Sequence, residues 1–341
     1  MIFRYPSYCD KFRCTADKCS DNCCIGWEID IDSGTLAYYQ GISGTFGKRL
    51  KENIADGCFV LGENERCPFL NSRNLCDIFT ELGEEHLCRI CTDHPRYFEW
   101  FGDVKEGGAG LCCEEAARLI LSNDFATAEK TVPDEDCDEC DEELFSFLVS
   151  ARSAIISHLQ TDSFTEAFCG MLDFAEELQY RIDNGEYSLP EFRQVTEPKT
   201  PDIQGIIRFL AELEPIDENW KPYAERCAAM ADEVTGEVPE HKPYMRKLAI
   251  YFIFRYFLKG TFDGEILSRV KLAAVSAWAI GYFWRCGLHE KGALTFEDMA
   301  QTAKNFSKEV EYSEENLDTL ADAFYDEEIF STERLTALFK N

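Results

Sequence analysis

Long apolar runs are scarce in this sequence of 341 residues. The best candidate for a membrane span, residues 272–284, is a thirteen-residue segment between Lys271 and Arg285. A helix that crosses a bilayer needs roughly 20 apolar residues, so no membrane span is expected. Residues 1–6 also lack the apolar run and small-residue cleavage site of a signal peptide. These absences predict a soluble, cytoplasmic protein.

Positive charge is also in short supply. The chain has 34 Lys and Arg residues against 64 Asp and Glu residues, which gives a formal net charge of −30 at pH 7. A field of this sign repels polyphosphates, so nucleic acid is not an expected partner. The same field would attract a basic peptide or a lysine-bearing protein, although acidic surfaces also serve solubility alone.

Cysteine, in contrast, is abundant and concentrated near the N-terminus. The chain has 17 cysteines, and twelve of them lie within residues 1–113. In a reducing compartment such thiols are more often metal ligands or catalytic groups than disulfides. The odd total and the adjacent pair Cys23-Cys24 also fit a disulfide framework poorly. Closely spaced cysteines let one turn present two sulfurs to one centre, which indicates a metal ion or an iron–sulfur cluster.

The spacing of the cysteines leaves the kind of metal open. Zinc commonly uses Cys-x2-Cys pairs, and only Cys88/Cys91 and Cys137/Cys140 have that spacing. The irregular gaps elsewhere favour an iron–sulfur cluster, most simply a 4Fe-4S cluster with about four thiolate ligands. Because more than eight cysteines are present, the segment could hold one centre with spare thiols, or two centres.

The expected fold is mainly α, in two parts. Residues 1–130 are expected to form an irregular cysteine-rich metal-binding domain with short strands. Residues 131–143 are expected to be an acidic linker, since 133–143 contain eight acidic residues. Residues 144–341 are expected to form an all-α helical domain, because apolar residues there recur at helical spacing.

Local patterns predict individual elements. Alternation of apolar and polar residues predicts a half-buried strand at 25–31, and Ser163-Phe164-Thr165-Glu166 has the form of a capping box. Residues 264–286 are apolar nearly all round, so this helix is expected to be the core of the second domain. Further strands are expected at 59–61 and 97–101, and further helices at 33–53, 114–123, 203–214, 220–235, 242–259, 296–309, 314–325 and 332–340.

The first segment resembles the opening of the flagellin lysine-N-methylase family, within the wider cysteine-cluster proteins. The resemblance covers residues 3 to about 121 and rests on motifs in the family's order. At its end, Glu114 follows Cys113 where the family usually has a proline. The matching motifs are Phe12-Arg13-Cys14, Cys19-Ser20-Asp21-Asn22-Cys23-Cys24-Ile25-Gly26-Trp27, Cys67-Pro68-Phe69-Leu70, Leu75-Cys76, Leu82-Gly83, Leu87-Cys88, Cys91, Pro95-Arg96 and Cys113-Glu114-Glu115-Ala116-Ala117-Arg118-Leu119.

The resemblance implies a protein lysine N-methyltransferase that transfers methyl groups from S-adenosylmethionine to flagellin and holds an iron–sulfur cluster. It also implies a ligand set. Cys9, Cys58 and Cys112 fall outside that set and read as small buried hydrophobes. The metal ligands implied by the resemblance are Cys14, Cys19, Cys23, Cys24, Cys67, Cys76, Cys88, Cys91 and Cys113.

The usual signatures of S-adenosylmethionine enzymes are missing. Residues 106–110 are glycine-rich, but no buried strand is expected at 102–105 and no βαβ alternation follows. This stretch therefore predicts a flexible loop. The Cys-x3-Cys-x2-Cys signature of radical enzymes is also missing. A cofactor bound near the cluster, whose exposed iron would hold its amino and carboxylate groups, remains the expectation.

Methylation of a lysine requires its ε-amine to be neutral, and therefore a base or a desolvated site. Asp93, His94, Tyr97 and Glu114 lie near the cysteines and are candidates for this catalytic role. His94 could equally be an interior histidine or a metal ligand, and Tyr97 a core residue. Arg96 could bind a cofactor carboxylate or cluster charge, or form a surface salt bridge.

Two further possibilities stay open at this point. Arg246, Tyr251, Arg255 and Tyr256 recur at helical spacing and could contact a partner, although helix packing explains them as well. The rival functions are a zinc- or iron–sulfur-stapled interaction module and an electron-transfer or redox-sensing protein without methyl transfer.

Overall fold

The computed structural model describes residues 1–341 except 20, 27, 136–139, 237 and 341. The chain forms two compact units. Phe12–Tyr97 form one, which we call the cysteine-rich unit; Met1–Lys11 and Phe98–Asn341 form the other, the helical unit. The helical unit thus includes two segments, 1–11 and 98–130, that the sequence analysis assigned to the N-terminal domain.

The cysteine-rich unit is built from short elements around a small core. Its helices are α1 (Ser33–Gly41), α2 (Gly44–Glu52), α3 (Asp77–Leu82) and α4 (Arg89–Asp93), and its hairpin pairs β2 (Ile54–Ala55) with β3 (Cys58–Phe59). The helix expected at 33–53 is therefore two helices. A Cβ on Gly47 would collide with the backbone of Ile42, so glycine allows α2 to pack against the turn between them.

The strand expected at 25–31 is wrong as a regular element. Within the described residues of this stretch there are only isolated antiparallel bridges, Ile25 to Arg66 and Asp30 to Cys58. Gly26 has a φ of +91°, which interrupts the extended conformation. The burial of Ile29 is confirmed, and Trp27 lies outside the described residues.

The helical unit contains one four-stranded sheet of order β4-β5-β1-β6. The strand β1 (Ile2–Pro6) runs parallel to β5 (Val104–Ala109) and antiparallel to β6 (Thr127–Thr131). Strand β4 (Arg96–Phe101) confirms the strand expected at 97–101. The flexible loop expected at 106–110 is wrong, because most of it lies in β5 and is buried. Pairing with β1, a hundred residues away in the chain, overrides the low strand propensity of glycine.

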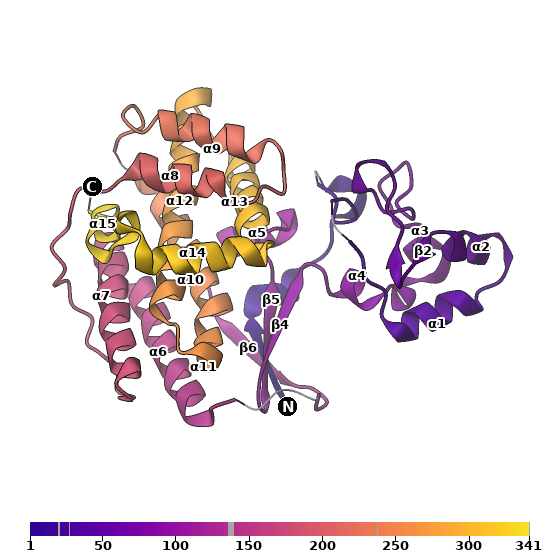
Figure 1. Ribbon diagram of the computed structural model, residues 1–341, viewed down its shortest axis with the longest axis horizontal. Helices are drawn as coiled ribbons and strands as arrows, with labels where there is room; N and C mark the ends of the chain where they lie inside the picture. The colour runs from indigo at the N-terminus through magenta and orange to yellow at the C-terminus, as the bar shows by residue number, and fades with distance from the viewer. Residues whose placement is uncertain (20, 27, 136–139, 237, 341) are drawn as a thin grey trace. The chain divides into compact units, whose positions relative to one another are not determined.

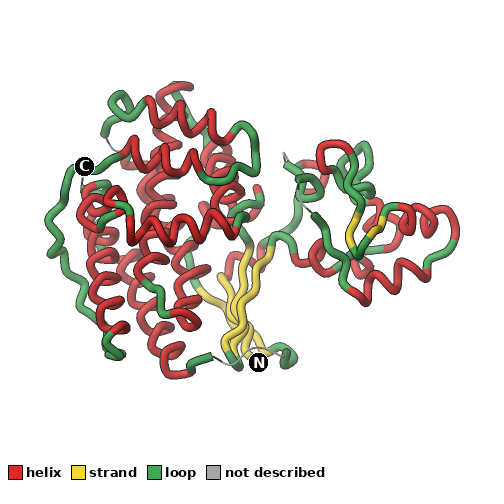
Figure 2. Tube along the Cα trace, viewed as in Figure 1, coloured by secondary structure: helices red, strands yellow, loops and turns green. Residues whose placement is uncertain are grey.

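Helices make up the rest of this unit (Figures 1 and 2), and from 144 onward the described residues form no strand. The mainly α fold is confirmed. The capping box is also confirmed, with Ser163 and Glu166 bonding each other's backbone. The helices are α5 (Glu114–Ser122), α6 (Glu142–Thr161), α7 (Phe164–Asp183), α8 (Ile203–Glu212), α9 (Trp220–Ala229), α10 (Lys242–Tyr256), α11 (Gly260–Asp263), α12 (Leu267–Lys291), α13 (Phe296–Glu311), α14 (Glu314–Asp326) and α15 (Thr332–Ala337).

Helix α12 is the core of the helical unit, as its composition predicts. It packs against α7, α10, α13 and α14, and its side chains from Val270 to Trp284 are buried on every face. Gly292, with a φ of +76°, ends the helix by a backbone bond to Leu288. No helix among the described residues is long and apolar enough to cross a membrane.

Candidate metal centre

Five cysteines gather at the core of the cysteine-rich unit. Cys67 and Cys88 are buried within a hydrophobic cluster that includes Tyr39 and Phe69. Three half-buried cysteines, Cys24, Cys76 and Cys91, pack against that same cluster. The thiols therefore occupy places that apolar side chains fill in an ordinary core.

Backbone bonds between distant loops bring these cysteines together. The amide of Cys67 donates to the carbonyl of Cys24 over 2.8 Å, and Leu70 forms a β-bridge with Cys76. Arg49 clamps the same loop, because its guanidinium donates to Asp77 at 2.7 Å and to the carbonyl of Pro68 at 2.6 Å. None of these backbone and side-chain contacts requires a metal ion.

Cys88 and Cys91 are placed by a helix start. Cys88 immediately precedes α4, and Cys91 lies one turn further on, so their Sγ atoms are 3.4 Å apart. The two sulfurs share a hydrogen bond, which raises the pKa of Cys91 and lowers the pKa of Cys88. A thiolate at Cys88 is therefore the easier of the two to form.

Burial and backbone donors act in opposite directions on the other thiols. Burial raises the pKa of Cys67 to about 11, although the backbone N–H groups of Phe69 and Leu70 point at its sulfur and favour the thiolate. Burial likewise raises the pKa of Cys76, against the backbone N–H groups of Phe79 and Ile78. Backbone donors aimed at buried sulfurs suit thiolates whose charge a metal neutralises.

Each thiolate in the group also makes the others harder to ionise. A hydrogen bond to Cys23 raises the pKa of Cys24, and burial and the charges of Cys67 and Cys76 add to the effect. Cys24 and Cys67 raise the pKa of Cys91 in the same way. The thiolates would repel one another within this core, and a bound cation would relieve their repulsion.

The distances between the sulfur atoms bear on which kind of metal centre the cysteines fit. Within the described part of the chain, three donor atoms lie within 4.8 Å of one another only at Glu28, Asp30 and Cys58. Sulfurs on one tetrahedral zinc stand about 3.8 Å apart, given Zn–S bonds of about 2.3 Å. Cys88 and Cys91, with Sγ atoms 3.4 Å apart, have nearly the separation of two ligands of one zinc ion, but no third core sulfur among the described residues joins them within 4.8 Å. The arrangement therefore leaves both zinc and an iron–sulfur cluster open.

The other cysteines of the implied ligand set lie outside this group. Cys14 is exposed and Cys19 half-buried, while exposed Cys23 bonds Cys24 at the edge of the core. Cys113 belongs to the helical unit, where it precedes α5. Its ligation, like that of Cys14 and Cys19, stays a prediction.

The three cysteines predicted to be extras have different settings. Cys9, in the helical unit, is half-buried. The thiol of Cys58 bonds the carboxylates of Asp30 and Glu28 at 3.0 and 3.1 Å, so it is not a simple hydrophobe. Cys112 is buried, which raises its pKa to about 12. Of the Cys137/Cys140 pair, Cys140 is half-buried and Cys137 lies outside the described residues.

The predicted catalytic residues of the cysteine-rich unit follow one another at the end of α4. Asp93 pairs with Arg89 at 3.5 Å, and His94 and Tyr97 are half-buried. Arg96 is exposed, donates to the carbonyl of Thr92 at 3.2 Å and lies 5.2 Å from the ring centroid of Phe12. Neither a carboxylate nor a cofactor group is needed to place Arg96 there.

The fourth candidate, Glu114, lies in the helical unit. It is 3% exposed and pairs with Arg118 at 2.9 Å, and Arg118 also bonds Glu297. Because Glu114 and Asp93 belong to different units, a common site for them stays a prediction.

The helical unit also buries two charged groups that sequence reasoning missed. Glu106 on β5 receives two bonds of 2.6 Å from Arg152 on α6. Glu311, fully buried, accepts bonds from Tyr251 and Tyr256 at 3.0 Å and pairs with Arg255. The helical spacing of Tyr251, Arg255 and Tyr256 was visible in the sequence and indicated that they share one face of a helix. It did not indicate that all three contact one carboxylate, that of Glu311, which lies 55 or more residues later in the chain.

Comparison with known proteins identifies a family and several relatives. The family model described as the FliB lysine N-methylase C-terminal domain matches residues 152–338. The lysine-N-methylase of Salmonella typhimurium is 27% identical over 142 residues, which are 37% of this chain and 35% of that protein. The flagellar biosynthetic protein FliU of Salmonella muenchen is 26% identical over 136 residues, 36% of this chain and 79% of that protein.

The lysine-N-methylase of Salmonella choleraesuis has the same identity and coverage as its typhimurium counterpart. The chain thus covers about a third of the length of these two relatives, 35% of each. No solved structure matches the chain.

Proposed function

The chain belongs to the FliB lysine N-methylase family, and from this we propose that it is a protein lysine N-methyltransferase that methylates flagellin with S-adenosylmethionine. The Salmonella relatives are named for lysine methylation and for flagellar biosynthesis. The observation that carries the proposal beyond these names is the group of buried thiols in the cysteine-rich unit.

We propose that this thiol group binds a 4Fe-4S cluster, with zinc as the alternative. Cys88 and Cys91 provide the adjacent pair, and Cys24, Cys67 and Cys76 belong to or pack against the same buried cluster. When bound, such a cluster supplies redox capacity or, at an iron without a protein ligand, a place for a cofactor's amino and carboxylate groups. Cys14, Cys19, Cys23 and Cys113 remain further proposed ligands.

The transfer itself needs little from the chain beyond placement and a base. S-adenosylmethionine supplies the methyl group when bound. The neutral lysine nitrogen forms a bond to the methyl carbon while the bond from that carbon to the sulfonium sulfur breaks, so that S-adenosylhomocysteine leaves and a base accepts the proton that the amine loses. Asp93, His94, Tyr97 and Glu114 are the proposed candidates for this base or for groups that orient the amine. Arg96, exposed beside them in sequence, is proposed to hold the cofactor's carboxylate.

The charge of the chain supports a basic substrate. A net charge of −30 raises the local concentration of lysine-bearing partners and hence their rate of association. The same field disfavours nucleic acid. High salt should therefore weaken capture of flagellin by screening this attraction.

The rival function is a metal-stapled or electron-transfer module. One observation supports this rival: thiols take the place of apolar side chains in the core of a unit whose helices and strands are short. A centre that merely held the fold together would need no cofactor. Loss of the metal centre distinguishes the two functions. For the methyltransferase, methyl transfer should be lost while the helical unit stays folded; the rival module has no methyl transfer to lose.

A methyl-transfer assay on the intact protein tests the proposal. Anaerobically purified protein is incubated with flagellin and methyl-labelled S-adenosylmethionine, and label on flagellin is counted. Cys88→Ser is expected to lose metal and activity together. The matched control is Cys169→Ser, which alters a buried cysteine of the helical unit and is expected to keep both.

The helical unit's thermal transition shows whether Cys88→Ser acts locally. If the variant loses its metal but retains methyl transfer, the centre is structural or incidental. If the metal-loaded parent protein transfers no label, the rival module is the better account.

A further inference from the structure

Two cysteines of the helical unit that none of the roles above uses form a buried pair. Cys227 lies on α9 and Cys286 on α12; both are 0% exposed and both are free thiols. A hydrogen bond joins the two thiols across the helices. Cys169, buried in the same unit, instead donates to the carbonyl of Thr336 at 3.7 Å. The contact between Cys227 and Cys286 is therefore a specific pairing of two sulfurs.

Bonds on either side of this pair hold α9 against α12. The hydroxyl of Tyr282, one turn before Cys286, donates to the carbonyl of Cys227 at 2.8 Å. Arg226, the residue before Cys227, donates to Glu290, one turn after Cys286, at 2.9 Å. A disulfide can bridge only cysteines that the fold already holds close together. These flanking bonds provide that fixed approach.

The surroundings make the two thiols chemically unequal. The hydrogen bond with Cys227 lowers the pKa of Cys286 against the effect of burial, and the hydroxyl of Tyr282 and the charge of Arg285 act in the same direction. The same bond, together with burial, raises the pKa of Cys227. Because a thiolate attacks an oxidant and a thiol does not, Cys286 is the sulfur that reacts first, and Cys227 is the neighbour that resolves it.

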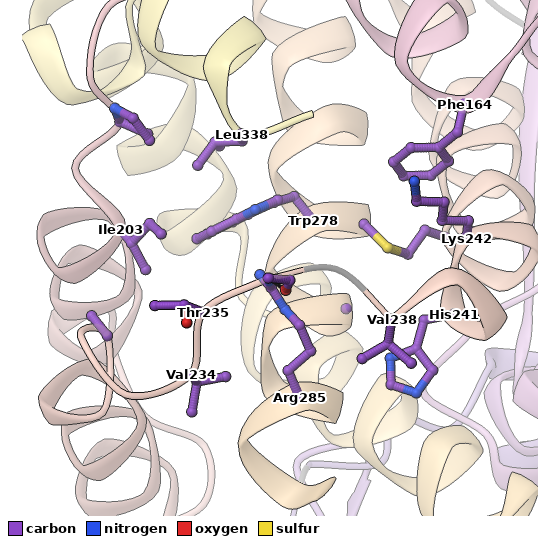
Figure 3. Close-up of a pocket in the computed structure, with 15 residues that line it drawn as sticks. Phe164, Ile203, Val234, Thr235, Val238, His241, Lys242, Trp278, Arg285 and Leu338 are labelled. Carbon is purple, nitrogen blue, oxygen red and sulfur yellow. Dashed lines mark hydrogen bonds between the residues drawn. The ribbon is translucent and has the colours of Figure 1, made fainter. Parts of the chain in front are cut away.

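A cavity close to the pair leaves this end of α9 loosely packed. Its volume is about 240 Å³, and it is lined by Val234 and Thr235, which follow α9, and by Trp278 and Arg285 of α12 (Figure 3). Arg285 directly precedes Cys286 in the chain. Space of this size admits a molecule as small as hydrogen peroxide, and incomplete packing lets α9 adjust its position against α12.

We propose that Cys227 and Cys286 are a peroxide-sensitive redox pair that locks α9 onto α12 as a reversible disulfide. The thiolate of Cys286 attacks one oxygen of hydrogen peroxide, the O–O bond breaks, and the departing hydroxide takes a proton and leaves as water. The sulfur of Cys227 then attacks the sulfenic acid of Cys286. The S–S bond forms, the S–O bond breaks, and a second water leaves with the proton of Cys227.

The electrons balance in this sequence, because two thiols are oxidised while one peroxide is reduced to two waters. A dithiol reductant reverses the change by thiol–disulfide exchange. The reaction uses neither the metal centre nor methyl transfer, so the proposal rests on neither of them.

Peptide mapping of the intact, reduced protein tests the proposal directly. The protein is treated with excess hydrogen peroxide, the remaining thiols are alkylated after denaturation, and the digest is analysed by mass spectrometry. The peptides of Cys227 and Cys286 are expected to appear cross-linked in most chains, and dithiothreitol is expected to release them. Amide exchange in α9 is expected to slow severalfold after oxidation, because the disulfide ties this short helix to α12.

Three variants assign the order of the reaction. Cys227→Ser is expected to lose the cross-link and to accumulate a sulfenic acid at Cys286, which a dimedone probe labels. Cys286→Ser is expected to lose the cross-link without such label at Cys227. The matched control is Cys169→Ser, which removes a buried thiol of the same unit and is expected to keep the full cross-link.

Any of three results overturns the proposal. Cys227 and Cys286 could both remain alkylated as separate thiols after peroxide treatment of the parent protein, a measurement that needs no variant. Dimedone could label Cys227 in Cys286→Ser as strongly as it labels Cys286 in Cys227→Ser. Exchange in α9 could slow equally in Cys286→Ser, which would mean that another oxidised group causes the change.

Discussion

Each of the two units of this protein is stabilised internally by a different kind of interaction. The helical unit surrounds α12, whose buried Tyr282, Phe283 and Trp284 form a large apolar core. Among its described residues, the cysteine-rich unit has α-helices of nine residues or fewer and a hairpin whose strands have two residues each. Part of its core consists of thiols, including buried Cys67 and Cys88. The first unit should thus fold by hydrophobic burial alone, while the second should depend on what its sulfurs bind.

Removal of the metal should have the largest effect, and it should separate the two units. Metal binding to a structural thiol site contributes on the order of 10 kcal/mol, more than a unit of short elements is expected to supply by itself. Chelation under oxidising conditions is expected to lower amide-exchange protection strongly in α1, α2 and the β2–β3 hairpin without unfolding them completely, while α12 keeps its protection. Full protection of both units after chelation would contradict this difference.

Removal of a buried ionic contact should affect the helical unit in turn. Arg152 and Glu106 are each 4% exposed, and two bonds of 2.6 Å join them. Arg152→Ala leaves the Glu106 carboxylate buried with only Arg4 nearby, so it should cost about 3–5 kcal/mol in urea unfolding, with the metal content unchanged. The control is Lys221→Ala, which breaks the exposed pair with Glu212 at 2.7 Å and should cost less than about 1 kcal/mol.

The thiols also predict how pH affects the cysteine-rich unit without its metal. Burial raises the pKa of Cys67 from 9.0 to about 11. A raised pKa means that the folded unit holds its proton longer than the unfolded chain does, so stability falls as pH rises from about 9 to about 11. Cys67 alone should contribute a loss of about 2–3 kcal/mol, since one pKa unit corresponds to about 1.4 kcal/mol. Urea unfolding of metal-free protein at several pH values measures this loss.

The Cys67→Ala variant provides the control for the pH experiment. It lacks the titrating thiol, so its stability should fall less over the same range. The same slope in both proteins would mean that Cys67 does not carry the effect. Metal binding should show the opposite trend and tighten as pH rises, because thiolates are the ligands.

The smallest predicted effect concerns one helix end. Ser163 and Glu166 form a capping box at the start of α7. Ser163→Ala should lower the stability of the helical unit by about 1 kcal/mol, and Ser163→Asp, which keeps an acceptor, should lower it far less. Thermal unfolding distinguishes the two variants. Equal losses would show that the cap does not depend on the side-chain acceptor.

The sequence predicts those structural features that depend on residues close to one another in the chain. The capping box at Ser163 and the all-apolar character of α12 are local, and both are confirmed. Most helix bounds in the helical unit fall within a few residues of those expected; α9 (Trp220–Ala229), expected at 220–235, ends six residues early. The strand β5 escaped prediction because its glycines have low strand propensity and because one of its two partners, β1, lies a hundred residues earlier, although the other, β4, directly precedes it in the chain.

In the candidate metal centre too, the sequence predicts contacts between residues close in the chain but not contacts between distant loops. The pairing of Cys88 with Cys91 follows from one turn of helix and could be predicted from their spacing. The approach of Cys24 to Cys67 depends on a backbone bond between two loops, which spacing does not reveal. The buried pair of Glu106 and Arg152 is harder still, because its partners lie 46 residues apart in the chain.

The most direct test of the account is the metal content and visible spectrum of anaerobically purified protein. We expect brown protein with about four irons per chain, whose absorbance is lost in Cys91→Ser and kept in Cys169→Ser. Such a result would place a cluster at the thiols of the cysteine-rich unit. Colourless protein with stoichiometric zinc, or iron that survives Cys91→Ser, would contradict the account.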